Sequence, residues 1–359
     1  MVLVGILVTD DPDLTLSKAT GLILGLTTWY YIPLTVRSFR QLHYSLLLFL
    51  LIALSFTFVG ILSTNWIFKI PLLDEIIRSL PAQRLVLPES PELGVQANQL
   101  AGTIIIYWPC LIALLFTTPF ASKKGRLFLI ISIILVTLFL ILSQSRSGWI
   151  GALGGLVFLL SWWVWLVLPT QQRWLMALGW LGVVVVCLVG YFLIGPERLQ
   201  PFWGDPVEKV VIGDFSSLGF RLEAWHWSVE GIKDFPLTGT GLGTFRRVVK
   251  RLFPIRIAPA YDMSHAHNIF LQVALDIGLP GLVAYIAMLL VAFVTGWQVA
   301  QQNKKLRPFA IGLLTGLMAL HIFGLTDALA LGSKTALLFW LDLGILTAMP
   351  TVLDSEEHT

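Results

Sequence analysis

Three short stretches of the sequence place cations and imidazoles beside turn residues. Arg146 lies in SQSRSGWIG, Arg221 lies in FRLEAW, and His265 and His267 lie in HAHN. A guanidinium presents a planar fork of N–H donors that suits phosphate, whereas a neutral imidazole can serve as a general base. These residue types predict a site that binds an anion next to a group able to accept a proton.

Arg146 occupies the junction between two apolar segments. A cation in so short a turn is costly when it faces lipid, so its side chain is expected to face the helix bundle or an aqueous cavity. The alternative is an interfacial anchor whose charged end reaches the lipid headgroups.

Arg221 begins an amphipathic segment. Apolar residues recur at helical spacing after it, and Pro236 ends the pattern. The pattern predicts a helix with Arg221 in its first turn, where a cation opposes the helix dipole. That unfavourable position indicates that an anion binds there; a salt bridge with Glu223 or Glu230 is the alternative.

A further helix is predicted to begin within the histidine-containing stretch. Ser264 or His265 is expected to cap it, and Gly278 and Pro280 are expected to end it after Ile277.

His267 would lie near the N-terminus of that helix, where the positive end of the dipole favours the neutral imidazole that a general base requires. Asn268 could orient this imidazole or bind a sugar hydroxyl, and a purely structural role for His267 stays open. A metal site made of Asp262, His265 and His267 is a further alternative. Its spacing follows no standard ligand pattern, so no metal is expected.

Other polar residues are secondary candidates. Asn98 precedes an apolar segment, where its amide could serve a site or cap a helix. Arg247 belongs to a basic cluster that could attract anionic lipid headgroups or form a solvated face. Asp327 and Lys334 are expected to form a salt bridge within a loop. The glycine-rich stretch PLTGTGLGTF follows no strand, so it predicts a turn that lets the backbone approach another segment closely.

Membrane-embedded helices must position these residues. The 359 residues are 56% hydrophobic and 13% charged, against roughly 25% charged in soluble domains. The net charge of +3 is spread among loops, which argues against a nucleic-acid partner. Cys110 and Cys187 lie in apolar runs and are expected to be packing residues, and Asp342 is the main charged residue placed within an apolar run.

The apolar runs predict an all-α polytopic membrane protein with about nine crossings. The expected spans are 19–36, 44–62, 99–118, 127–143, 148–168, 174–194, 279–300, 308–326 and 335–350, and residues 1–9 are too few to span. Lys and Arg fall in alternate short loops, which places those loops in the cytoplasm. The predicted organisation is N-terminal transmembrane helices at 1–194, a large periplasmic loop with amphipathic helices at 195–266, and C-terminal transmembrane helices at 267–359.

Four motifs in one order resemble the O-antigen ligase and O-antigen polymerase superfamily of bacterial envelope proteins. They are ANQLAG at 97–102, SQSRSGWIG at 143–151, FRLEAW…DFPLTGTGLGTF at 220–245 and HAHNIFLQVALDIGLPG at 265–281. The sequence also resembles the cyanobacterial branch, some members of which were tied to inorganic-carbon uptake. The resemblance implies a GT-C-like helical bundle in the bacterial inner membrane, with a large periplasmic loop over a cavity.

The resemblance also implies an activity. By position, Arg146 and Arg221 match arginines thought to hold a donor diphosphate, His267 matches a histidine at the acceptor side, and His265 matches a less uniform position. The implied reaction is an inverting, metal-independent and cofactor-free transfer of a saccharide from undecaprenyl diphosphate to a hydroxyl of a lipid or glycan acceptor. An O-antigen or exopolysaccharide polymerase, an anion (bicarbonate) transport protein and a non-catalytic envelope scaffold remain alternatives.

Overall fold

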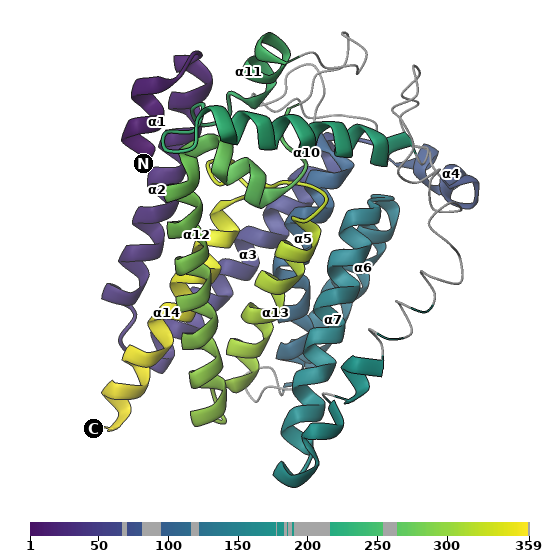
Figure 1. Ribbon diagram of the computed structural model, residues 1–359. Coiled ribbons are helices and arrows are strands. Elements are labelled where there is room, and N and C mark those ends of the chain that lie inside the picture. The colour runs from purple at the N-terminus through teal and green to yellow at the C-terminus, as the bar shows by residue number, and fades with distance from the viewer. Residues whose placement is uncertain are drawn as a thin grey trace.

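The chain forms a bundle of long apolar helices with shorter helices across one end (Figure 1). The structure, a computed structural model, describes residues 1–66, 70–80, 95–115, 122–176, 178–182, 185, 189, 216–253 and 264–357. Much of the predicted span 174–194, residues 195–215 and 254–263 of the predicted loop, and thus Cys187 and Asp262, lie outside the described residues.

The long helices follow the apolar runs of the sequence. They are α2 (Pro12–Thr35), α3 (Phe39–Ser63), α5 (Ala97–Leu114), α6 (Lys123–Leu142), α7 (Arg146–Val167), α12 (Ile269–Gln302), α13 (Arg307–Phe323) and α14 (Leu337–Glu357). Five of the described helices, α3, α5, α6, α7 and α12, are long and apolar enough to cross a membrane, and α13 and α14 are shorter apolar helices. The chain is therefore an all-α polytopic membrane protein, and nine crossings stay a prediction.

The short elements lie between these helices. They are α1 (Val2–Val8), α4 (Pro71–Ser79), α10 (Ser216–Asp234), α11 (Phe245–Leu252), a 3-10 turn at Thr170–Gln172, and the two-residue strands β1 (Thr64–Asn65) and β2 (Val95–Gln96), which pair in parallel. The N-terminal segment that is too short to span is thus helical, and both α10 and α11 fall within the segment predicted to carry amphipathic helices.

Local sequence explains where several helices begin. A helix leaves its first backbone N–H groups without intrahelical partners, and a short polar side chain just before it can accept from them. The residues that do so are Asp11 before α2, Ser38 before α3, Ser122 before α6, Ser145 before α7 and Asn268 before α12.

Helix α5 is the centre of the bundle. Most of its length is buried, whereas about a third of α3, α6, α7 and α12 is buried, and it packs against α3, α6, α7 and α13. Small residues allow the close approach: a Cβ on Gly316 of α13 would collide with the Ile106 carbonyl of α5. Cys110 is buried in this core, as expected of a packing residue.

Helix α10 lies across the end of the bundle opposite the C-terminus (Figure 1). Its buried residues Phe220 and Ala224 belong to a second, smaller apolar core that joins α10 and α11 to the start of α12. Its other members are Phe245, Val249, Ala266 and Leu275. This packing holds α10 beside the segment that carries the two histidines.

Helix α12 is kinked where the sequence predicts an end. Ile277 and Gly278 leave helical geometry, with Gly278 at φ 74°, but the chain resumes a helix to Gln302. The glycine-rich turn fits against this kink. The N–H of Thr240 donates to the Leu275 carbonyl at 2.6 Å, and a Cβ on Gly239 would lie 2.7 Å from the nitrogen of Gly278. The close backbone approach expected of the turn is therefore made to α12.

Candidate functional site

Four separate segments meet at residues 324–327, which we call the 324–327 turn, directly after α13. Asn98 of α5, Ser147 of α7, Arg221 of α10 and the segment before α12 all bond to it. Each of these segments belongs to one of the four sequence motifs. The motifs are therefore distant in sequence but share one polar contact point.

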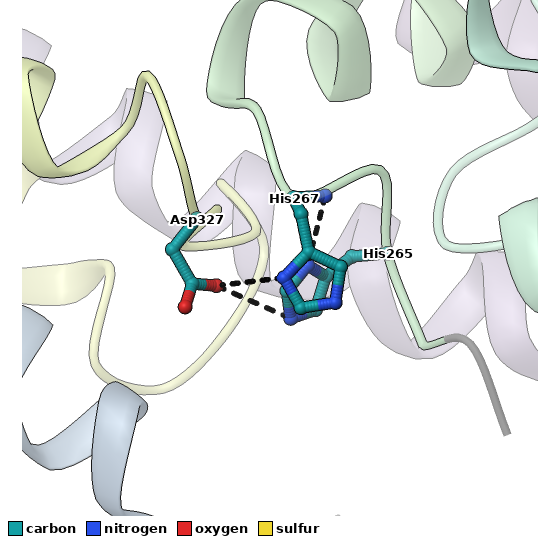
Figure 2. Close-up of side chains that lie close together, drawn as sticks. All are labelled: His265, His267 and Asp327. Carbon is teal, nitrogen blue, oxygen red and sulfur yellow. Dashed lines mark hydrogen bonds and ion pairs between the residues drawn. The ribbon is translucent and has the colours of Figure 1, made fainter. Parts of the chain in front are cut away.

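Asp327 is the centre of this arrangement. Its Oδ2 accepts a hydrogen bond from Nδ2 of Asn98 at 2.8 Å and lies 3.9 Å from NH2 of Arg221. Its Oδ1 lies 3.6 Å from Nε2 of His265 and 3.5 Å from Nδ1 of His267, as Figure 2 shows. We call these five residues the Asp327 cluster.

The charges in the Asp327 cluster favour the ionised form of Asp327. Burial alone would raise the pKa of Asp327, but His267, His265 and Arg221 outweigh it and lower that pKa well below its ordinary value. Nδ1 of His267 lies 3.5 Å from Oδ1 of Asp327, and it has no hydrogen-bond partner within the part of the chain that the structure describes. Burial, and next the charge of His267, lower the pKa of His265 to about 3, so His265 is neutral near pH 7.

His267 is held in an uncommon backbone conformation. Its φ is 50°, in the left-handed region that few non-glycine residues adopt. The structure caps α12 with Asn268, whose Oδ1 accepts from the N–H groups of Phe270 and Leu271, rather than with Ser264 or His265. His267 therefore lies just before the helix, not inside it. The indole of Trp225 donates to the His267 carbonyl at 3.0 Å and fixes the residue from the α10 side.

The two ring nitrogens of His267 have different surroundings. Nδ1 is directed toward Asp327, and the other ring nitrogen, Nε2, lies on the side away from it (Figure 2). When the proton is on Nδ1, facing the carboxylate, the lone pair of Nε2 is available to accept a proton. This is the arrangement of a positioned general base, which the sequence predicted for this residue.

Arg221 is oriented by the 324–327 turn. Its Nε donates to the Thr326 carbonyl at 2.6 Å, and its NH2 faces Asp327. Because α10 begins at Ser216, Arg221 lies in the second turn of the helix and not in the first, so the predicted conflict with the helix dipole is weaker than expected. The alternative partner Glu230 pairs with Lys233 instead.

Arg146 lies at the junction of α6 and α7, as the sequence predicts, and its side chain is exposed instead of packed inside the bundle. Its neighbour Ser147 accepts a hydrogen bond from the Thr326 hydroxyl at 2.9 Å, which brings the start of α7 to the 324–327 turn. The junction repeats the geometry seen at His267. Gln144 has φ 49°, and Ser145 after it caps the helix. Two left-handed residues thus precede two capped helices at the same site.

The secondary candidates separate into two groups. Asn98 and Asn268 are part of the site, because Asn98 bonds to Asp327 and Nδ2 of Asn268 donates to the Leu325 carbonyl at 3.1 Å. Arg247 is not: it lies on α11, is exposed, and has its Nε 3.6 Å from Oδ2 of Asp11.

The predicted loop salt bridge between Asp327 and Lys334 is wrong. Asp327 pairs with Arg221, His265 and His267 because its backbone follows α13 directly and turns the side chain into the bundle end, whereas Lys334 is exposed. Sequence reasoning missed Asp327 and Thr326 as site residues. The available signal was their position: a polar turn after a span, predicted on the same side of the membrane as HAHN.

One group of described residues could hold a metal ion. His265, His267 and Asp327 each offer one ligand atom, and these atoms lie within 4.8 Å of one another. Among the described residues, Asp327 is the third residue of this group, and Asp262 lies outside the described residues.

Comparison with known proteins gives one family. Residues 131–286 match the model of the O-antigen ligase family. The matched segment contains Arg146, Arg221, His265 and His267, and ends before the 324–327 turn. A search of curated proteins found no match. The match covers less than half of the chain, and this part of the chain is similar to the O-antigen ligase family.

Proposed function

We propose that this protein is a membrane glycosyltransferase of the O-antigen ligase type. It transfers a saccharide from an undecaprenyl-diphosphate carrier to a hydroxyl of a lipid or glycan acceptor, at the periplasmic face of the bacterial inner membrane. The observation that carries the proposal is the meeting of a guanidinium, two imidazoles and a buried carboxylate at the 324–327 turn. The family match to residues 131–286 supports the same class of reaction.

The donor diphosphate is assigned to Arg221 and Arg146. A guanidinium has five N–H donors in a fixed fork, and the bond from Nε of Arg221 to the Thr326 carbonyl fixes the direction of that fork. Arg146 stands at the N-terminus of α7, where backbone N–H groups and the dipole also favour an anion. Positive groups at both positions stabilise the negative charge that develops on the leaving diphosphate.

The acceptor is activated by His267. Nε2 takes the proton of the acceptor hydroxyl while its oxygen attacks the anomeric carbon of the sugar. The bond from that carbon to the diphosphate oxygen breaks, and the lipid diphosphate leaves with the electron pair. The carboxylate of Asp327, 3.5 Å from Nδ1, stabilises the imidazolium that forms. The protein needs no redox step and no nucleotide sugar in this scheme.

The site lies where a lipid-linked donor can reach it. Helix α10 lies across the bundle end next to the Asp327 cluster, and its tryptophans suit the membrane–water interface. A donor held in the bilayer by its polyprenyl chain would present its diphosphate at this depth.

The test is glycan transfer by the purified chain in reconstituted membranes. Undecaprenyl-diphosphate oligosaccharide and candidate acceptors are supplied to the wild type, Arg221→Ala and His267→Ala. The matched controls are Arg40→Ala and His226→Ala, which remove exposed residues of the same types outside the Asp327 cluster. We expect product from the wild type and both controls only. One added chain identifies a ligase, and a ladder of repeats identifies a polymerase.

Two outcomes would sink the proposal. The first is equal product from Arg221→Ala, His267→Ala and the wild type. The second is no product from folded wild-type protein with any acceptor, together with bicarbonate flux that depends on the same residues. That second result would favour the transport alternative.

A further inference from the structure

We propose that His265, His267 and Asp327 form a binding site for a transition-metal dication such as Zn²⁺, and that an ion bound there switches the transferase off. The binding part stands on the geometry of the three side chains alone. The inhibitory part rests on the proposed function, because it concerns the base that the function assigns to His267.

The distances fit a tetrahedral ion. Ligands about 2.0–2.1 Å from a tetrahedral Zn²⁺ lie roughly 3.3–3.4 Å from one another. Oδ1 of Asp327 lies 3.6 Å from Nε2 of His265 and 3.5 Å from Nδ1 of His267. Two of the three ligand–ligand distances are therefore within a few tenths of an ångström of the tetrahedral value. All three ligand atoms lie within 4.8 Å of one another, so the third ligand–ligand distance, between the two imidazole nitrogens, is at most that long.

The contacts around the three side chains also resemble those around metal ligands in proteins. Nδ1 of His267 is buried and has no hydrogen-bond partner among the described residues, which is an unfavourable state that a coordinate bond would relieve. The second oxygen of Asp327 is held by Asn98 and faces Arg221. Ligating carboxylates are usually fixed in this way by outer partners. Two imidazoles and one carboxylate favour Zn²⁺, Co²⁺ or Ni²⁺ over Mg²⁺ and Ca²⁺, which prefer oxygen ligands.

Three features oppose a cation: the hydrogen bond that His265 accepts, and the positive charges of Arg221 and Arg246. Nδ1 of His265 accepts the N–H of His267 at 3.3 Å, and this long bond is lost when the Nε2 proton of His265 moves to Nδ1 on coordination. The positive charge of Arg221 repels the ion. Arg221 approaches Oδ2, however, whereas both imidazoles face Oδ1, so the carboxylate lies between the guanidinium and the proposed ion.

Inhibition follows from the tautomer of His267. As a base, the imidazole carries its proton on Nδ1 and offers the lone pair of Nε2. An ion on Nδ1 requires the proton to be on Nε2, which then has no lone pair to accept the acceptor proton. The proton moves within the ring, and no other reactant is needed.

The experiment measures binding and activity separately. Metal-free protein in detergent is titrated with Zn²⁺ against a chromophoric chelator, and with Co²⁺, whose visible spectrum reports tetrahedral coordination. The variants are His265→Ala, His265→Gln and Asp327→Asn, and the control is His226→Ala. Transfer by the wild type is then measured with and without Zn²⁺, with Mg²⁺ in a parallel series. Thermal melts in detergent identify any variant that does not fold.

We expect one Zn²⁺ per chain in the wild type and in His226→Ala. Loss of even an outer-shell partner costs roughly 10–100-fold in metal affinity, so we expect at least about a tenfold loss in each folded ligand variant. Zn²⁺ should stop transfer and Mg²⁺ should not.

Affinity equal to the wild type in a folded His265 variant, or no bound ion in the wild type, would overturn the site. Bound Zn²⁺ with undiminished transfer would overturn the inhibition alone. Absence of transfer from the metal-free wild type would count against the proposed function, and the binding result would stand by itself.

Discussion

Two buried aspartates, one at the end of the bundle and one inside it, have opposite environments. Asp327 follows α13, and Asn98, Arg221, His265 and His267 from three other segments surround it. Asp342 lies within α14 and is fully buried, and neither of its carboxylate oxygens has a hydrogen-bond partner among the described residues.

The difference shows that burial alone does not identify a functional carboxylate in a membrane protein. A buried polar group is costly unless it is paired, so the partners must be examined in each case. At Asp327 the partners are themselves cations and imidazoles with chemistry to offer. Asp342 lies instead in a closely packed part of the core, since a Cβ on Gly316 would lie 3.5 Å from its Oδ2. Substitution of the same residue type at both positions tests this comparison directly.

Asp327→Ala should have the largest effect. It leaves Arg221, whose side chain is 16% exposed, without its carboxylate partner, and breaking a buried ion pair typically costs about 3–5 kcal/mol. We expect a loss of this size in the free energy of unfolding, measured by denaturant titration in lipid–detergent mixtures, together with loss of transfer. An unchanged unfolding free energy would show that the partners of Asp327 contribute no net stability.

His267→Ala should reduce transfer about 10²–10⁴-fold, the usual contribution of a general base. The fold should tolerate this change better than Asp327→Ala, because Asp327 keeps Asn98 and Arg221 as partners. Initial rates of transfer under saturating donor are the measurement, with the melting temperature as the control for folding. A rate within twofold of the wild type would exclude His267 as the base.

Asp342→Ala should raise the free energy of unfolding, whereas Asp327→Ala should lower it. It removes a buried carboxyl group without described partners, and an unsatisfied buried polar group costs about 1–3 kcal/mol. We therefore expect the free energy of unfolding to rise by up to that amount, with transfer unchanged. Asp342→Ala is measured beside Asp327→Ala in the same denaturant series. A loss of stability or of transfer activity in Asp342→Ala would contradict the contrast between the two residues.

Arg247→Gln should have the smallest effect. Its contact with Asp11 is an exposed ion pair, and such pairs contribute about 0–1 kcal/mol. We expect near-wild-type stability and transfer, in contrast to Arg221→Ala. A large loss of transfer in Arg247→Gln, measured as the initial rate at several donor concentrations, would extend the site to α11.

The sequence predicted the individual residues and helices of the site more accurately than the contacts between them. Arg146 at a helix junction, the helix that carries Arg221 and a helix that starts next to the two histidines are all found in the structure. Their local details differ: Asn268 is the cap of α12, and Arg221 lies one turn further into its helix. Caps and helix ends depend on hydrogen bonds among a few neighbouring groups, so a sequence pattern locates a helix more accurately than it locates the ends of that helix.

The class of the protein was determined by the sequence, because apolar runs of sufficient length can satisfy their backbone in lipid only as helices. The site was decided by the tertiary structure. Asp327 bonds to Asn98 across 229 residues, and Thr326 bonds to Arg221 and Ser147 across 105 and 179 residues. No local pattern encodes such contacts. They exist because α5, α7, α12 and α13 pack side by side, and this packing brings their polar ends to the same turn.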